Sequence, residues 1–435
     1  MTREVTAEPG RRSVPSEQVG GLENVELLRG FGATALCALV GTYLVIRIYR
    51  TSSVVDLPND RSSHTAPTIR GAGLALAVAM FVGLEVAGGG RFEGIDLLIV
   101  GTALCALVGL TEDLVGLRAL VRLGLQIVTA SFVLPTLFAD TVLTAGERTA
   151  LSALALVVLV GFVNAFNFMD GINGISGWHA VVMGGAYALL GLQQDEPAIL
   201  VAGVVAAGGG IGFLPWNFPR ARCFLGDAGS YALGAWFAIT FLLCVRAGVA
   251  LDVAAAPLAL YVADAGVTLI RRVRRGERWY ESHREHVYQR LTEAGQWTHA
   301  RASLFVAGMS GIVGVLGLAA DGAAMGVRVL LWLAAATTLA AYLLSGGLVR
   351  RLRARTSPTA PPALGGELAE ERIGDPLGGT AVPEDWPSWD DPRVDRRTSG
   401  LTDRRRRRPD HHVGAFGDGD RAFGAVAQGD ARDAE

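Results

Sequence analysis

Residues 150–168 read ALSALALVVLVGFVNAFNF, an apolar run close to the ~20 residues that an α-helix needs to cross a bilayer. Comparable runs recur along the chain at 31–48, 72–88, 95–111, 123–138, 175–192, 198–215, 229–246, 252–270, 302–320 and 325–346. We therefore expect an all-α, polytopic integral membrane protein with about 11 transmembrane helices.

The composition supports a membrane protein. Apolar residues make up 51% of the 435 residues and charged residues only 18%. A soluble chain of this length would carry more charge. The near-neutral net charge of −2 says little about partners, because it averages an apolar body with a highly charged end. No feature of the sequence predicts nucleic-acid binding.

The arginines predict the orientation of the helices. They concentrate in the first, third, seventh and ninth connections, and they close the last helix at Arg350 and Arg351. Cytoplasmic connections are the ones that carry excess arginine. We therefore expect a multi-pass protein of the plasma membrane, with a polar N-terminal segment (1–30), a membrane domain (31–350) and a disordered cytoplasmic tail (351–435).

Unusual polar clusters fall on the connections predicted to be cytoplasmic. Glu112 and Asp113 form an acidic pair at the end of an apolar run. A carboxylate at such a place usually lines a wet cavity or binds a cation. An ordinary polar helix end explains this pair equally well.

The fifth connection is more specific. Asn164, Asn167 and Asp170 recur every three residues, and Asn173 follows between two glycines. This spacing predicts two amides and a carboxylate along one helical stripe. Their oxygens suit a hard cation and the polar edge of a nucleotide. A helix cap would need one such residue rather than four.

The seventh connection places Asp227 between glycines, directly before an apolar run. A carboxylate there can hold a pyrophosphate through a metal, although an ordinary N-cap is an equally good interpretation. Two further clusters carry groups that suit phosphates and sugar hydroxyls. They contain Asn59, Arg61, Ser62, His64 and Arg70 in the first connection, and His283, Arg284 and His286 in the ninth.

These clusters, in this order, resemble the polyprenyl-phosphate N-acetylhexosamine-1-phosphate transferases, the membrane family that includes the peptidoglycan translocase making lipid I. The resemblance runs from about Asp56 to about Leu291. It implies a UDP-sugar donor, a polyprenyl-phosphate acceptor, release of UMP and dependence on magnesium, with manganese as the alternative ion.

The resemblance also implies residue roles. Glu112, Asp113 and Asp170 are expected to be catalytic, and Asp227 and Asn167 to bind the metal. The substrate-binding residues expected are Asn59, Arg61, Ser62, His64, Arg70, Asn164, Asn173, His283, Arg284 and His286.

Two departures from the family pattern narrow this expectation. Glu112 replaces an aspartate, and Tyr288 and Gln289 stand where other branches have histidines. The second departure resembles the branch that primes O-antigen and related surface polysaccharides. The alternatives are a phospho-MurNAc-pentapeptide transferase, a CDP-alcohol-type phosphotransferase, and a membrane transporter or lipid flippase. A homodimer is one option for the assembly.

Overall fold

A computed structural model describes residues 24–49, 55–56, 68–138, 143–278, 284–293 and 296–356. Five predicted substrate-binding residues lie outside these ranges, namely Asn59, Arg61, Ser62, His64 and His283. Most of the predicted N-terminal segment and most of the predicted tail also lie outside them.

The described residues are almost entirely helical. The α-helices are α1 (Asn24–Tyr49), α2 (Gly73–Val86), α3 (Ile95–Val115), α4 (Ala119–Val133), α5 (Ala145–Met169), α6 (Ile175–Gln194), α7 (Pro197–Asn217), α8 (Gly226–Arg246), α9 (Leu251–Ala255), α10 (Ala259–Arg274), α11 (Val287–Glu293), α12 (His299–Ala320) and α13 (Met325–Thr356). Three 3-10 helices are η1 (Gly89–Arg91), η2 (Leu134–Phe138) and η3 (Ala256–Leu258). The predicted all-α, polytopic fold is confirmed.

Ten helical segments in the described part of the chain are long and apolar enough to cross a membrane. The run predicted at 72–88 forms the shorter helix α2, which has 14 residues. At 1.5 Å per residue it extends roughly 21 Å, less than the ~30 Å hydrocarbon core. The residues shortly before α2 form strand β2, and Gly88, in the left-handed conformation, follows the end of α2. By this length criterion, the described residues contain ten spans and α2 as a shorter apolar helix, which agrees with the prediction of about 11.

The run predicted at 252–270 is one apolar segment built from α9, η3 and α10. Pro257 lies in the 3-10 helix between the two α-helices. Because proline has no N–H group to donate, it interrupts the regular helical hydrogen bonds.

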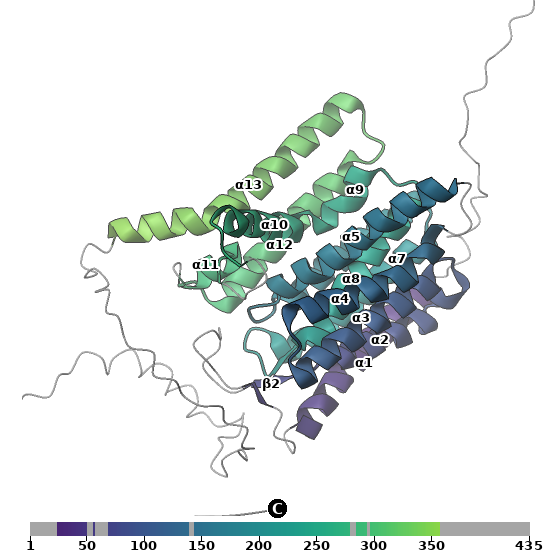
Figure 1. Cartoon of the computed structure of the whole chain (residues 1–435), viewed down its shortest axis with the longest axis horizontal. Coiled ribbons are helices and arrows are strands. Elements are labelled where there is room, and N and C mark those ends of the chain that lie inside the picture. The colour runs from purple at the N-terminus through teal and green to yellow at the C-terminus, as the bar shows by residue number, and fades with distance from the viewer. Residues whose placement is uncertain are drawn as a thin grey trace, which may run out of the picture. The chain divides into compact units, whose positions relative to one another are not determined.

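Helix α8 lies at the centre of the bundle, with 94% of its apolar stretch buried, whereas the figure for α13 is 11%. Figure 1 shows α3, α4, α5, α7 and α8 side by side, with α10 to α13 next to one another. The exposed apolar residues of α4 and α13, such as Phe132 and Leu330, suit contact with lipid.

A small sheet, absent from the sequence prediction, lies at one end of these helices. Its strands are β1 (Val55–Asp56), β2 (Thr68–Arg70) and β3 (Cys223–Phe224), in the order β1-β2-β3. Strand β1 pairs antiparallel with β2, and β2 pairs parallel with β3. The sheet joins the connection before α2 to the connection before α8.

Candidate active site

The pairing of β2 with β3 places Arg70 beside the start of α8. Arg70 is in register with Phe224, and the Gly73 amide donates to the Leu225 carbonyl at 2.8 Å. Two segments about 150 residues apart in sequence therefore meet at the helix terminus that carries Asp227.

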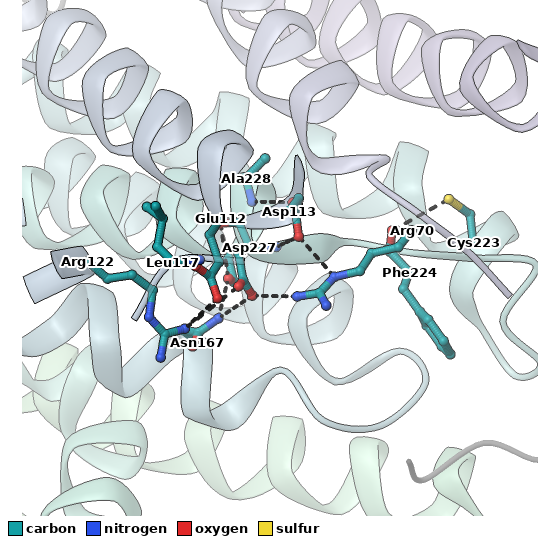
Figure 2. A network of polar contacts seen from close by, with 11 residues as sticks. Arg70, Glu112, Asp113, Leu117, Arg122, Asn167, Cys223, Phe224, Asp227 and Ala228 are labelled. Carbon is teal, nitrogen blue, oxygen red and sulfur yellow. Dashed lines mark hydrogen bonds and ion pairs between the residues drawn. The ribbon is translucent and has the colours of Figure 1, made fainter. Parts of the chain in front are cut away.

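Asp113 caps the N-terminus of α8 from another helix. Its Oδ1 accepts the Asp227 amide and its Oδ2 accepts the Ala228 amide, both at 2.9 Å (Figure 2). The residue at the N-cap position is Leu225, whose side chain has no acceptor. The first amides of a helix need an acceptor and favour negative charge nearby. The Asp113 carboxylate supplies the acceptor and the negative charge.

This arrangement leaves the Asp227 carboxylate for other partners. Its Oδ1 accepts Nη2 of Arg70 at 2.8 Å and Nδ2 of Asn167 at 2.9 Å. Arg70 also pairs through Nε with Asp113 at 2.9 Å. The interpretation of Asp227 as an ordinary N-cap is wrong, because Asp113 performs that task.

Glu112, unlike Asp113, contacts a backbone amide of its own connection and an arginine of α4. Its Oε2 accepts the Leu117 amide at 2.6 Å, and its Oε1 pairs with Nη1 of Arg122 at 3.1 Å. The same Nη1 lies 4.0 Å from Oδ2 of Asp227. Arg122 therefore bridges the two acids. In the sequence, Arg122 indicated only the orientation of the helices. Its position one turn into α4, near the acidic pair, was the feature that could have indicated a place in the site.

Glycines allow the helices to approach closely around Asp227. A Cβ on Gly109 would lie 2.2 Å from the Asp227 carbonyl oxygen, and one on Gly73 would lie 2.1 Å from the Gly229 nitrogen. Gly226 has φ +77°, and a Cβ there would lie 2.7 Å from Oδ2 of Asp113. Backbone contact between α2, α3 and α8 thus fixes the site.

Asp170 ends α5 beside this network. Ser176 donates its hydroxyl to Oδ1 of Asp170 at 2.5 Å. Burial raises the pKa of Asp170 to about 6, and the nearby Asp227 carboxylate raises it as well, whereas the Ser176 hydrogen bond lowers it.

The other two polar residues of the fifth connection, Asn164 and Asn173, have other partners. Asn164 donates to Oε1 of Gln126 at 2.6 Å, deeper along α5, and Asn173 donates to the Pro219 carbonyl at 3.4 Å. Of the four polar residues in this connection, Asn167 donates a hydrogen bond to Asp227. Asp170 lies close enough for the Asp227 charge to raise its pKa.

The described residues of the ninth connection contact acidic side chains. His286 is 2% exposed, and its Nδ1 lies 3.2 Å from Oδ1 of the buried Asp264. Arg284 is partly exposed and pairs with Glu293 at 3.2 Å. The structure therefore gives His286 an internal partner and does not present its imidazole at the surface. Asp264 lies in an apolar run and was not among the predicted site residues.

The donor set suits a hard cation that retains part of its coordination shell. No three His, Cys, Asp or Glu side chains among the described residues converge as a closed metal cage. Magnesium commonly binds through one or two carboxylates together with substrate phosphates and water. Asp227 supplies such a carboxylate, and Asn167, which donates its Nδ2 to Asp227 at 2.9 Å, would add its amide oxygen.

The start of α8 therefore carries an acid- and arginine-rich site at the ends of apolar helices. Residues 96–245 match the model of glycosyl transferase family 4. The chain is 30% identical over 331 residues to a decaprenyl-phosphate N-acetylglucosaminephosphotransferase of Mycobacterium tuberculosis, an alignment that covers 66% of this chain and 81% of the relative. The chain belongs to this family of membrane transferases.

Two other relatives indicate the range of the family. A probable undecaprenyl-phosphate N-acetylglucosaminyl 1-phosphate transferase of Bacillus subtilis is 27% identical over 281 residues, which cover 62% of this chain and 78% of the relative. A phospho-N-acetylmuramoyl-pentapeptide-transferase of Latilactobacillus sakei is 32% identical over 160 residues, which cover 33% of this chain and 50% of the relative.

Proposed function

We propose that this protein transfers an N-acetylhexosamine-1-phosphate from a UDP-sugar to a polyprenyl phosphate and releases UMP. The observation that carries the proposal is the meeting of Asp113, Asp227, Asn167, Arg70 and Arg122 at the N-terminus of α8. Carboxylates, guanidinium groups and a helix N-terminus together suit a reaction in which two phosphorylated substrates approach each other.

The donor is an N-acetylglucosamine nucleotide in this proposal. The relatives named for N-acetylglucosamine transfer align over 78–82% of their length. Relatives named for the pentapeptide substrate align over 50–70% of their length. This difference in coverage favours the branch of the family that begins a cell-envelope polysaccharide. The presence of Tyr288 and Gln289, where other branches have histidines, favours the same branch.

Arginines neutralise charge in the proposed reaction. Arg70 and Arg122 flank Asp227, and their side chains are 40% and 26% exposed. Each presents a planar set of donors that matches phosphate oxygens. They would hold the donor pyrophosphate and the acceptor phosphate together and reduce the repulsion between them.

Asp227 and Asn167 would hold a divalent cation, magnesium or manganese. When bound, this cation supplies positive charge to the transferring phosphoryl group and the leaving UMP. Asp113 keeps the α8 terminus and Arg70 in place, since both of its oxygens already accept backbone amides. Asp170 lies at the edge of the network, where its carboxylate would orient the acceptor phosphate or the sugar.

The proposed site faces the cytoplasm. Asp113 lies near the end of α3, Asp170 follows α5 and Asp227 begins α8, so all three occupy one end of their helices. The arginine-rich connections predicted to be cytoplasmic share that end. Transport sites usually lie near the middle of broken helices, so this placement favours an enzyme over a transporter.

A direct assay tests the proposal. Purified protein in detergent is incubated with polyprenyl phosphate, magnesium and UDP-GlcNAc, UDP-GalNAc or UDP-MurNAc-pentapeptide. We expect UMP and a lipid-linked sugar pyrophosphate with an N-acetylhexosamine donor. Release of UDP would instead indicate transfer of the sugar without its phosphate and would overturn the reaction class. The Asp227→Asn variant serves as the inactive control.

A further inference from the structure

Asp264 is a buried carboxylate of α10 that the proposed chemistry does not use. Its exposed fraction is 0%. It accepts the Val287 amide at 3.0 Å and the Tyr342 hydroxyl at 2.7 Å, and it lies 3.2 Å from Nδ1 of His286. Thr268 adds a contact of 3.3 Å within α10. A buried carboxylate requires such partners, and three of these four residues come from outside α10.

The contacts of Asp264 determine where α11 lies. This helix has seven residues, Val287–Glu293, which is too short to be stable without tertiary contacts. Asp264 accepts its first amide. Helix α13 also packs closely against α11, because a Cβ on Gly346 would lie 3.2 Å from Cβ of Arg290. In Figure 1, α11 lies next to α10 and α13.

Helix α11 in turn contacts the connection that carries Asp170. The Tyr288 hydroxyl donates to the Phe168 carbonyl at 2.9 Å. A Cβ on Gly171 would lie only 2.1 Å from that hydroxyl oxygen. The His286 ring also packs on the Phe168 ring at 6.2 Å between centroids. Tyr288 thus contacts the chain on both sides of Asp170.

We infer that Asp264 is a positioning residue for the transfer reaction. It anchors α11, and α11 through Tyr288 sets the path of residues 168–171 and therefore the place of Asp170. The kinetic consequence rests on the proposed function. The anchoring itself does not, because it concerns contacts between described helices.

The test compares Asp264→Asn, Tyr288→Phe and the double variant in the full chain. Asp264→Asn keeps the size of the side chain but removes its charge and one acceptor, and Tyr288→Phe removes only the hydroxyl that reaches Phe168. Each single change is expected to lower kcat by roughly tenfold or more, the effect of losing one hydrogen bond to a charged group or its dependent contact. Because both act along one route, the double variant is expected to lose much less than the product of the two effects.

Hydrogen exchange measures the anchoring without any assay of activity. In Asp264→Asn, the amides of residues 286–291 and 170–174 are expected to exchange faster than in the wild type. The matched control is Asp252→Asn, which removes an acid that pairs with Arg328 of α13 but lies in α9, away from α11. It is expected to leave kcat and both segments unchanged.

The outcomes separate the inference from the proposed function. If Asp264→Asn lowers only the yield or the thermal midpoint and leaves kcat unchanged, or if its effect multiplies fully with that of Tyr288→Phe, the inference is wrong. If the wild type transfers no sugar phosphate, the proposed function fails, and unchanged exchange in residues 170–174 would then also reject the anchoring. Should Asp264→Asn not fold, Tyr342→Phe removes a single donor and is expected to give a smaller loss of kcat in the same direction.

Discussion

Replacing Gly226 with alanine tests whether the α8 terminus is set by its contact with Asp113. Alanine at φ +77° costs about 1–2 kcal/mol of backbone strain. Its Cβ would also lie 2.7 Å from Oδ2 of Asp113, so the carboxylate must move. Loss of one hydrogen bond to this charged group costs about 1.5–3 kcal/mol. We expect that second cost to reduce kcat by roughly 10- to 150-fold.

Gly248→Ala is the matched control for this prediction. Gly248 follows the other end of α8 and has φ +82°, but no atom lies within 4 Å of a Cβ placed there. Both variants therefore carry similar strain, and only Gly226→Ala disturbs Asp113. UMP release and the thermal midpoint in detergent are measured for both. Equal activity in the two variants would refute the proposed dependence of the site on the Asp113 contact.

Three further changes address individual carboxylates. Asp227→Asn is expected to abolish transfer and the thermal stabilisation by magnesium together; near-normal turnover would remove the metal assignment. Asp113→Asn replaces one carboxylate oxygen that accepts a helix amide with an NH2 group, which cannot accept it. We therefore expect kcat to fall by roughly tenfold or more while nucleotide affinity is kept. The control is Asp96→Asn, which changes an exposed residue in the first turn of the same helix. Since the pKa of Asp170 is raised to about 6, its carboxylate is ionised above that pH and protonated below it. Between about pH 8 and pH 5 we therefore expect kcat to decline as the pH falls through 6, and a wild-type decline that persists in Asp170→Asn would show that another group titrates.

The lengths of the apolar runs were sufficient to predict the spanning helices, because bilayer thickness sets the length of each run. Every predicted run contains a helix or helical segment. The three-stranded sheet was not predictable, because its strands have two or three residues and because β2 and β3 pair across about 150 positions. Strands of this length are too short to show the alternation of apolar and polar residues from which a strand is predicted.

The candidate site was predictable as a set of connections, but the pairing of its residues was not. Sequence reasoning singled out Asp113 and Asp227, yet nothing in the local sequence indicated that one caps the helix of the other. The contact of His286 with Asp264 was also not predictable, because Asp264 lies in an apolar run. Arginine patterns likewise predicted a side of the membrane but not the bridge from Arg122 to Asp227.

The joining of β2, the end of α3 and the start of α8 limits how this protein can be re-engineered. A chimaera that receives only the seventh connection from a relative would bring a new α8 terminus without the Asp113 and Arg70 that match it. Its alignment with strand β2 would be equally foreign. Donor preference is therefore expected to transfer between relatives only when these three segments are grafted as one unit.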